Sequence, residues 1–234
     1  MSTLAKFHAV MAPFLRGEST ASEVERLLGP SPSGTGRLAL YPLLVRRQAT
    51  GLVDHFFRAL AAALELDAPG AFAGLRDAYL VAHPPKSWEP NENLRAFPAF
   101  VMAWHGAPLW APEMADYAWA RFVAMHADRV PGDVGLERVV FVRHYTHDVL
   151  AASRANESTT GASRTPRPAP ETLVFARHAA SPWRHLVTLT PSVAALFALL
   201  GASGEVLPPL PLGVTEADLA LELAALRQAG ILGP

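Results

Sequence analysis

Histidine is the residue type in this chain with the most evident capacity for chemistry. Nine histidines are present, and two of them, His144 and His147, form an H-x-x-H pair that Asp148 follows. On a helix this spacing can bring two imidazoles to one face and create a metal site, whereas on a strand the rings point to opposite faces. The segment reads ERVVFVRHY, which is the β-branched and aromatic composition of a strand. We therefore predict that the pair binds no metal ion.

Sequence motifs for catalysis and for cofactor binding are missing from the chain. It contains no cysteine, which excludes a thiolate nucleophile, a thiolate metal site and a disulfide. It also lacks H-E-x-x-H, a Walker loop, a G-x-G-x-x-G after a strand and a G-x-S-x-G elbow. An active site assembled from distant residues stays an open alternative. The sequence nevertheless favours a protein with no catalytic residues, no metal and no cofactor of its own.

The composition is that of a folded protein with balanced charge. Of 234 residues, 50% are hydrophobic, and 20 basic residues stand against 21 acidic ones. Binding to nucleic acid requires basic residues concentrated on one face, and the total shows no surplus of them. No apolar run approaches the ~20 residues of a membrane span, and the N-terminal MSTLAKFHAVMAPF lacks the long apolar core of a signal peptide. We expect a cytoplasmic protein.

Helical periodicity dominates residues 1–130. Apolar residues recur at three- and four-residue steps over 4–14, 38–60, 72–79, 94–104 and 114–125. Thr20 and Glu23 resemble a capping box, and Pro42 must either kink the helix over 38–60 or lie in its first turn. We predict a bundle of about six helices as an N-terminal domain over residues 1–130, followed by a break rich in glycine, proline and aspartate.

The apolar period changes from 3.6 to 2 after residue 130. ERVVFVRHY, TLVFAR and RHLVTL read as strands, and the polar SRANESTTGASRTPRPAP reads as a long loop between the first two. Helices are predicted over 191–200 and from Thr215 onward. We therefore predict an α+β fold, in which the helical bundle precedes a small winged-helix-like domain over residues 131–234. That domain is expected to hold a three-stranded antiparallel sheet and two or more helices.

Three segments, in this order, resemble one protein family. They are the R-L-x-x-Y of Arg37 to Tyr41 with the apolar pattern after it, the A-Y-L-x-x-H-P-P-x-S-W that ends at Trp88 with the F-P-A-F of Phe97 to Phe100, and the M-A-D-Y-A-W-A of Met114 to Ala120. Together they are similar to the HvfC/BufC-type family, which carries the label of a DNA-binding domain. The resemblance covers residues 4–130 and, more loosely, the tail. The chain departs from the family's pattern at Pro42 and Ala118.

The resemblance implies a function in the modification of ribosomally made peptides. Members of this family are typically encoded beside multinuclear non-heme iron-dependent oxidative enzymes and act as their non-catalytic partners, as in the biosynthesis of the copper-binding methanobactins. By the resemblance, this chain would recognise the leader of a precursor peptide and present it to the iron enzyme in a heterodimer. The iron would belong to that enzyme.

Two sets of residues are the candidates for these contacts. A peptide can add as a further strand to an exposed sheet edge, where alternate side chains line its pockets. The candidate peptide-binding residues accordingly alternate along two predicted strands: Val139, Phe141 and Arg143, and Leu173, Phe175 and Arg177. Which strand forms the edge stays open. The candidates for the interface with the partner enzyme lie in the helical domain: Arg37, Tyr41, His83 and Trp88.

The alternative function is that of a DNA-binding transcriptional regulator, which the family's label and the winged-helix-like outline suggest. The last predicted helix, TEADLALELAALRQAG, carries three acidic residues, Glu216, Asp218 and Glu222, and a single basic one, Arg227. Because phosphate repels an acidic helix, this composition argues against duplex binding. The sequence therefore favours the peptide-recognition partner over the regulator.

Overall fold

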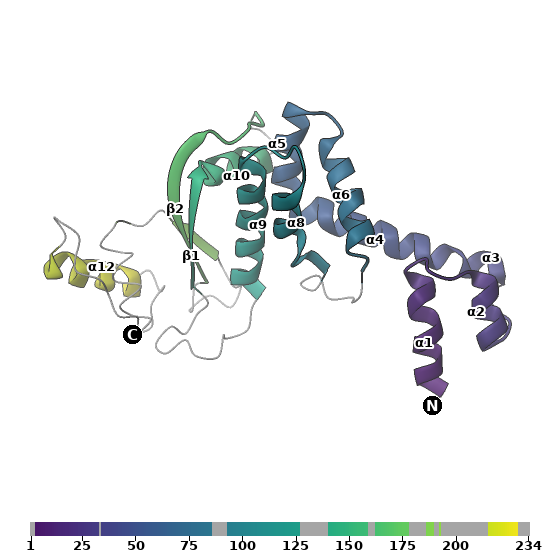
Figure 1. The fold of residues 1–234 in the computed structure, drawn as a ribbon. Coiled ribbons are helices and arrows are strands. Elements are labelled where there is room, and N and C mark those ends of the chain that lie inside the picture. The colour runs from purple at the N-terminus through teal and green to yellow at the C-terminus, as the bar shows by residue number, and fades with distance from the viewer. Residues whose placement is uncertain are drawn as a thin grey trace.

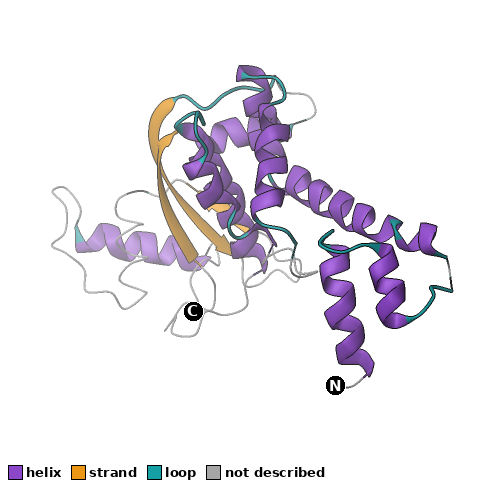
Figure 2. Ribbon diagram, turned by 45° about the vertical axis from the view of Figure 1, so that its right-hand side comes forward, coloured by secondary structure: helices purple, strands orange, loops and turns teal. Residues whose placement is uncertain are grey.

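The structure is a computed structural model of the chain. It describes residues 3–32, 34–85, 93–126, 140–158, 162–177, 186–189, 192 and 215–228. Helices dominate these residues, and the strands gather beside one group of helices (Figure 2).

The first helices form an arm that projects from the rest of the protein (Figure 1). The arm consists of α1 (Thr3–Leu15), α2 (Ala21–Leu28), α3 (Thr35–Leu38) and the first half of α4 (Leu40–Phe56), which runs on into the body. The predicted capping box is confirmed at the start of α2. The Glu23 N–H donates to the Thr20 hydroxyl at 3.2 Å, and the Thr20 N–H donates to the Glu23 carboxylate at 2.7 Å. The core of the arm is small: Phe14, Val24 and Leu38.

The start of helix α4 agrees with the sequence-based prediction, whereas its end does not. Pro42 is the third residue of α4, in its first turn, where the missing N–H costs no intrahelical hydrogen bond. The predicted continuous helix over 38–60 is instead interrupted at Phe57 (φ −107°, ψ 25°), after which α5 (Arg58–Asp67) begins. Phe57 is 1% exposed, and its ring stacks on Phe97 with centroids 4.1 Å apart. The interruption thus lies where the chain enters the core of the body.

The core of the body is an aromatic cluster between helices. Around it lie α5, α6 (Ala71–Ala82), α8 (Phe97–Ala103) and α9 (Trp110–His126). Rings of Phe57, Phe72 and Tyr79 contact the fully buried Phe97. The Tyr79 hydroxyl donates to the Asn93 carbonyl at 2.5 Å, and burial raises the pKa of Tyr79 to about 12. This phenol is therefore neutral and hydrogen-bonded at physiological pH.

The sheet packs against α9 and shares the core of the body. β1 (Val140–His147) pairs antiparallel with β2 (Pro168–Arg177), and β3 (Leu186–Leu189) pairs with the last four residues of β2. The Tyr117 ring of α9 lies 5.5 Å from the Phe175 ring of β2. Tyr145, Leu173 and Phe175 belong to the same buried cluster as the helices of the body.

The predicted α+β fold with a winged-helix-like tail is wrong. The chain is mostly helical, and its sheet is in the main a two-stranded ladder of β1 and β2 that completes the core of the helical body. An apolar period of 2 locates strands, but it does not indicate which helices cover them. In this protein the strands are covered by α9. The predicted boundary between residues 130 and 131 falls within 127–139, outside the described residues, and stays a prediction.

The first part of the predicted polar loop is a helix. α10 (Val149–Glu157) follows β1 and packs against α5 and α9, with Val149 and Ala152 buried. The Asn156 amide donates to the Ala59 carbonyl of α5 at 3.1 Å. The last described helix, α12 (Glu216–Gln228), starts after Thr215 as predicted, whereas the helix predicted over 191–200 lies outside the described residues apart from Ser192. Among the described helices, none combines the length and the apolar character that crossing a membrane requires.

Candidate protein-binding surfaces

β1 is an edge strand of the sheet. The strand order is β1-β2-β3, so β2 has a strand on both sides, whereas β1 has one on a single side within the described part of the chain. β3 is the other edge, but it offers only four residues. The outer side of β1 is therefore the longer edge to which an extended peptide could add its own backbone hydrogen bonds.

Helix α9 holds β1 from one face through the Asp116 carboxylate. Arg143 Nε donates to Asp116 Oδ2 at 3.2 Å, and the Tyr145 hydroxyl donates to the same oxygen at 2.9 Å. Burial, reinforced by the neighbouring Asp116 charge, raises the pKa of Tyr145 well above its usual value, so this phenol stays a donor. Two residues of the edge strand are thus fixed to one helix, which keeps the edge ordered before any peptide arrives.

A second carboxylate of α9 closes the end of β1. The pairing of β1 with β2 shifts register between Tyr145 and His147, and Glu113 receives the backbone N–H groups there, from Thr146 at 3.0 Å and from His147 at 3.1 Å. Burial raises the pKa of Glu113, but the hydrogen bonds from Thr146 and His147 outweigh it and hold that pKa below the usual value. Since these two N–H groups are occupied, the edge open to a peptide ends before Thr146.

The residues predicted to line the peptide site lie mainly on the covered face of the sheet. Arg143 is the Cα partner of Leu173, and Phe141 is the partner of Phe175, so the two predicted sets share one face of the ladder. That face packs on α9. Leu173 and Phe175 are both 0% exposed, and these two assignments are corrected: their side chains form the core and cannot line a peptide pocket.

The other predicted peptide-binding positions differ in what the structure describes. Arg143 is half-buried and bound to Asp116. Phe141 and Arg177 lie within β1 and β2, but their side chains are outside the described part of the structure, as is the whole of Val139. The sequence did contain a signal that β2 is buried, because its unbroken apolar run LVFA is typical of a strand covered on both faces, and Val174, on the opposite face from Leu173 and Phe175, is buried as well.

The H-x-x-H histidines contact different partners. His144 is exposed, with Nδ1 2.8 Å from the Thr172 hydroxyl of β2, while His147 Nδ1 lies 3.1 Å from the Glu113 carboxylate of α9. Where side chains are described, no three histidine, aspartate or glutamate residues gather as they would to hold a metal ion. What this part of the protein presents is therefore an ordered strand edge.

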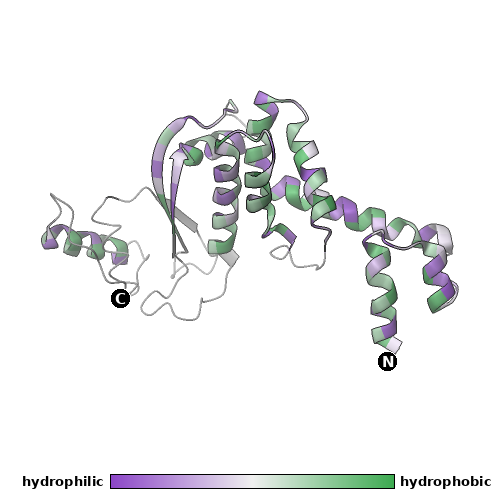
Figure 3. Ribbon diagram, in the orientation of Figure 1, coloured by the Kyte–Doolittle hydropathy of each residue, from purple (hydrophilic) through white to green (hydrophobic). Residues whose placement is uncertain are grey.

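The second candidate surface lies on the arm. Leu40, Tyr41, Leu43 and Leu44 are exposed by 50–62% on the first half of α4, and Leu4 and Phe7 are exposed on α1. Figure 3 shows these helices carrying apolar residues although they stand outside the body. Single exposed leucines are common, whereas exposed apolar patches are typical of surfaces that contact another protein, so the arm is a candidate for such a contact.

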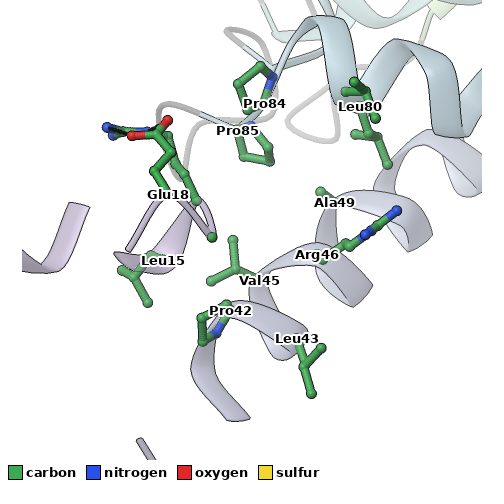
Figure 4. Close-up of a pocket in the computed structure, with 13 residues that line it drawn as sticks. Leu15, Glu18, Pro42, Leu43, Val45, Arg46, Ala49, Leu80, Pro84 and Pro85 are labelled. Atoms are coloured by element: carbon green, nitrogen blue, oxygen red, sulfur yellow. Dashed lines mark hydrogen bonds and ion pairs between the residues drawn. The ribbon is translucent and has the colours of Figure 1, made fainter. Parts of the chain in front are cut away.

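A groove of about 490 Å³ adjoins this cluster, between the end of α1, the first half of α4 and the end of α6 (Figure 4). We call it the α4 groove. Its lining is largely apolar, with Leu15, Pro42, Leu43, Val45, Ala49, Leu80, Val81, Pro84 and Pro85, and it includes the charged residues Arg16, Glu18 and Arg46. Its volume is in the range of ligand pockets, which runs from roughly 300 to 1,000 Å³.

Two of the four residues predicted for the partner interface, Tyr41 and His83, directly precede residues that line this groove. Tyr41 is half-exposed and precedes Pro42 of one wall, and the exposed His83 precedes Pro84 and Pro85 of the opposite wall. The His83 ring stacks on the buried Tyr79, with centroids 4.9 Å apart. Arg37 is exposed on α3, and Trp88 lies outside the described residues.

The groove itself was not predicted, because residues from three helices form it and no single spacing in the sequence encodes their approach.

Comparison of the chain with protein-family models and with curated proteins finds no match.

Proposed function

We propose that this protein is a non-catalytic partner in the modification of a ribosomally made peptide. It binds the leader of the precursor along the outer edge of β1 and presents the peptide to a multinuclear non-heme iron-dependent enzyme that docks on the arm. We also propose that residues 4–130 belong to the HvfC/BufC-type family and that the protein is cytoplasmic.

The observation that carries the proposal is the ordered outer edge of β1, which no described strand covers. A peptide that pairs with this edge gains main-chain hydrogen bonds without requiring a preformed pocket. The carboxylates of Glu113 and Asp116 fix the strand in advance, so that little ordering entropy is lost when the peptide binds. The Leu173 and Phe175 core behind the strand supports it.

The arm supports the second half of the proposal. Its exposed apolar cluster and the α4 groove lie away from β1, at the other end of the body (Figure 1), so that peptide and enzyme can be bound at once. No described feature favours the DNA-binding alternative. Glu216 and Asp218 are exposed on α12, and the first turn of that helix would face phosphate with negative charge.

The test is co-purification of the chain with a multinuclear non-heme iron enzyme encoded beside it, followed by titration of the complex with the precursor peptide. We expect a stable heterodimer, a leader that binds the complex, and no conversion of the peptide by this chain alone. If neither the enzyme nor the peptide associates with the full chain, the proposal is wrong. A salt-dependent shift of duplex DNA at physiological ionic strength would support the regulator instead.

A further inference from the structure

We propose that the α4 groove binds an amphipathic helix of the partner protein, one that carries acidic residues beside its apolar stripe. Assigning that helix to the iron enzyme rests on the proposed function. The chemistry of the groove does not depend on that assignment.

The proposal of an apolar stripe follows from the apolar side chains that the groove leaves exposed to solvent. Leu43 is 62% exposed and Val81 is 76% exposed, and they stand on α4 and α6 at the groove. Leu15, Val45 and Leu80 belong to the same apolar lining (Figure 4). Burying such surfaces against an apolar stripe is favourable in proportion to the area removed from water.

The walls of the groove favour an occupant whose backbone N–H and C=O groups are hydrogen-bonded to each other. Pro42, Pro84 and Pro85 have no N–H to donate, and the other lining residues have their N–H groups paired within helices or in the turn after α1. The groove therefore offers no backbone donor to an extended peptide, which would bury unpaired C=O groups at a cost. A helix pairs them internally and presents residues i, i+3, i+4 and i+7 to the groove.

The charge at the groove selects for acidic residues. Arg16 is paired with Glu18, at 2.7 and 2.8 Å, so these two groove residues neutralise each other. Arg46 is exposed at the groove and forms no ion pair with the described part of the chain. The sequence from Arg26 to Val53 contains no acidic residue at all. An incoming carboxylate thus meets a guanidinium that no described acidic residue neutralises, which attracts it and can bind it bidentately.

An anionic membrane surface shares part of this chemistry, but the shape of the site favours a helix. Membrane-binding helices present a convex apolar face to the lipid, whereas here three helices enclose a hollow. Vesicle binding is therefore an outcome of the test that would overturn the proposal.

The experiment measures fluorescence anisotropy of two labelled synthetic helical peptides with the full-length protein. Both carry the same leucine stripe, and they differ only in having glutamate or lysine at the flanking positions. We expect the glutamate peptide to bind at least about tenfold more tightly than the lysine peptide, with a difference that shrinks as salt rises.

Matched variants locate the binding. Leu43→Glu and Arg46→Glu should each weaken binding of the glutamate peptide by about tenfold. Two exposed control positions that do not line the groove, Leu66→Glu on α5 and Arg47→Glu on α4, should change it less than about threefold. Arg46→Glu should also improve binding of the lysine peptide. Because all four side chains are exposed, circular dichroism should show an unchanged fold.

Three results would overturn the inference: no binding of either peptide, equal losses in the groove variants and the control variants, or binding only to vesicles of anionic lipid. If the peptides fail while the precursor leader and the iron enzyme still bind the chain, the proposed function stands and only the groove assignment is wrong.

Discussion

The arm and the body of this protein bury their apolar residues to very different degrees. In the body, a continuous cluster extends from Val53 through the aromatic rings around Phe97 to Phe175 of the sheet. In the arm, three buried side chains hold the helices together, while leucines of α1 and α4 stand in water. The comparison indicates that the body sustains the fold, whereas the arm keeps apolar surface exposed, as the proposed contact with a partner requires.

The largest expected effect is on the core of the body. Phe97→Ala removes a ring that contacts Phe57, Phe72 and Tyr79, and we expect it to cost about 3–5 kcal/mol of unfolding free energy. Urea denaturation followed by circular dichroism measures this cost. A loss below about 1 kcal/mol would mean that the aromatic cluster does not dominate the stability of the body.

Phe14→Ala is the matched change in the arm. Phe14 is 2% exposed in a cluster of three, so its loss should loosen α1 to α3 without lowering the urea midpoint of the body. Hydrogen exchange should accelerate in residues 3–38 and stay unchanged in α9. If exchange in α9 rises equally, the arm and the body unfold as one unit, which would contradict the difference in stability between them.

Asp116→Asn tests the support of the edge strand. The variant weakens two charge-assisted hydrogen bonds, from Arg143 and from Tyr145, and should cost about 1–3 kcal/mol. Asp67→Asn, on the exposed end of α5, is the control and should stay within about 0.5 kcal/mol of the wild type. Equal effects of the two variants in thermal denaturation would show that Asp116 does not stabilise β1.

The smallest effect concerns pH. The pKa of Glu113 is lower in the folded than in the unfolded chain, so its contribution to stability is present above about pH 4.5 and is lost as the pH falls through its folded pKa. Glu113→Gln should therefore destabilise the protein at neutral pH and converge with the wild type in acid.

Glu171 provides the control of opposite sign. Burial raises its pKa, so its contribution is present below its unfolded pKa and is lost as the pH rises through the folded pKa. Glu171→Gln should accordingly cost less at neutral pH than Glu113→Gln. Unfolding free energies measured between pH 3 and pH 7 compare the two, and parallel pH profiles would contradict both assignments.

The sequence predicts local structure here better than it predicts burial. The period of Leu4, Phe7, Met11 and Phe14 indicates a helix, and α1 is one, yet only Phe14 is buried, because helix periodicity does not say whether a partner covers the apolar face. The Thr20 capping box was predictable because it is encoded within four residues.

The errors come from tertiary contacts. The second half of α10, Ser153–Glu157, was predicted as the start of a loop because four of its five residues are polar, whereas Val149 and Ala152, which are buried in the helix, precede that segment. Leu173 and Phe175 were assigned to a peptide site because alternation separates the faces of a strand without identifying the covered one. The α4 groove depends on the approach of α1, α4 and α6, which no local pattern contains.

Hydrogen exchange with mass spectrometry on the full chain tests the division of labour most directly. The chain is measured alone, with the precursor peptide, and with the iron enzyme. We predict that the peptide slows exchange in β1 over residues 140–145 while the central positions of β2, already paired, change little, and that the enzyme slows exchange in α4. Protection of α4 by the peptide with no change in β1 would contradict the account, as would the absence of protection in both elements.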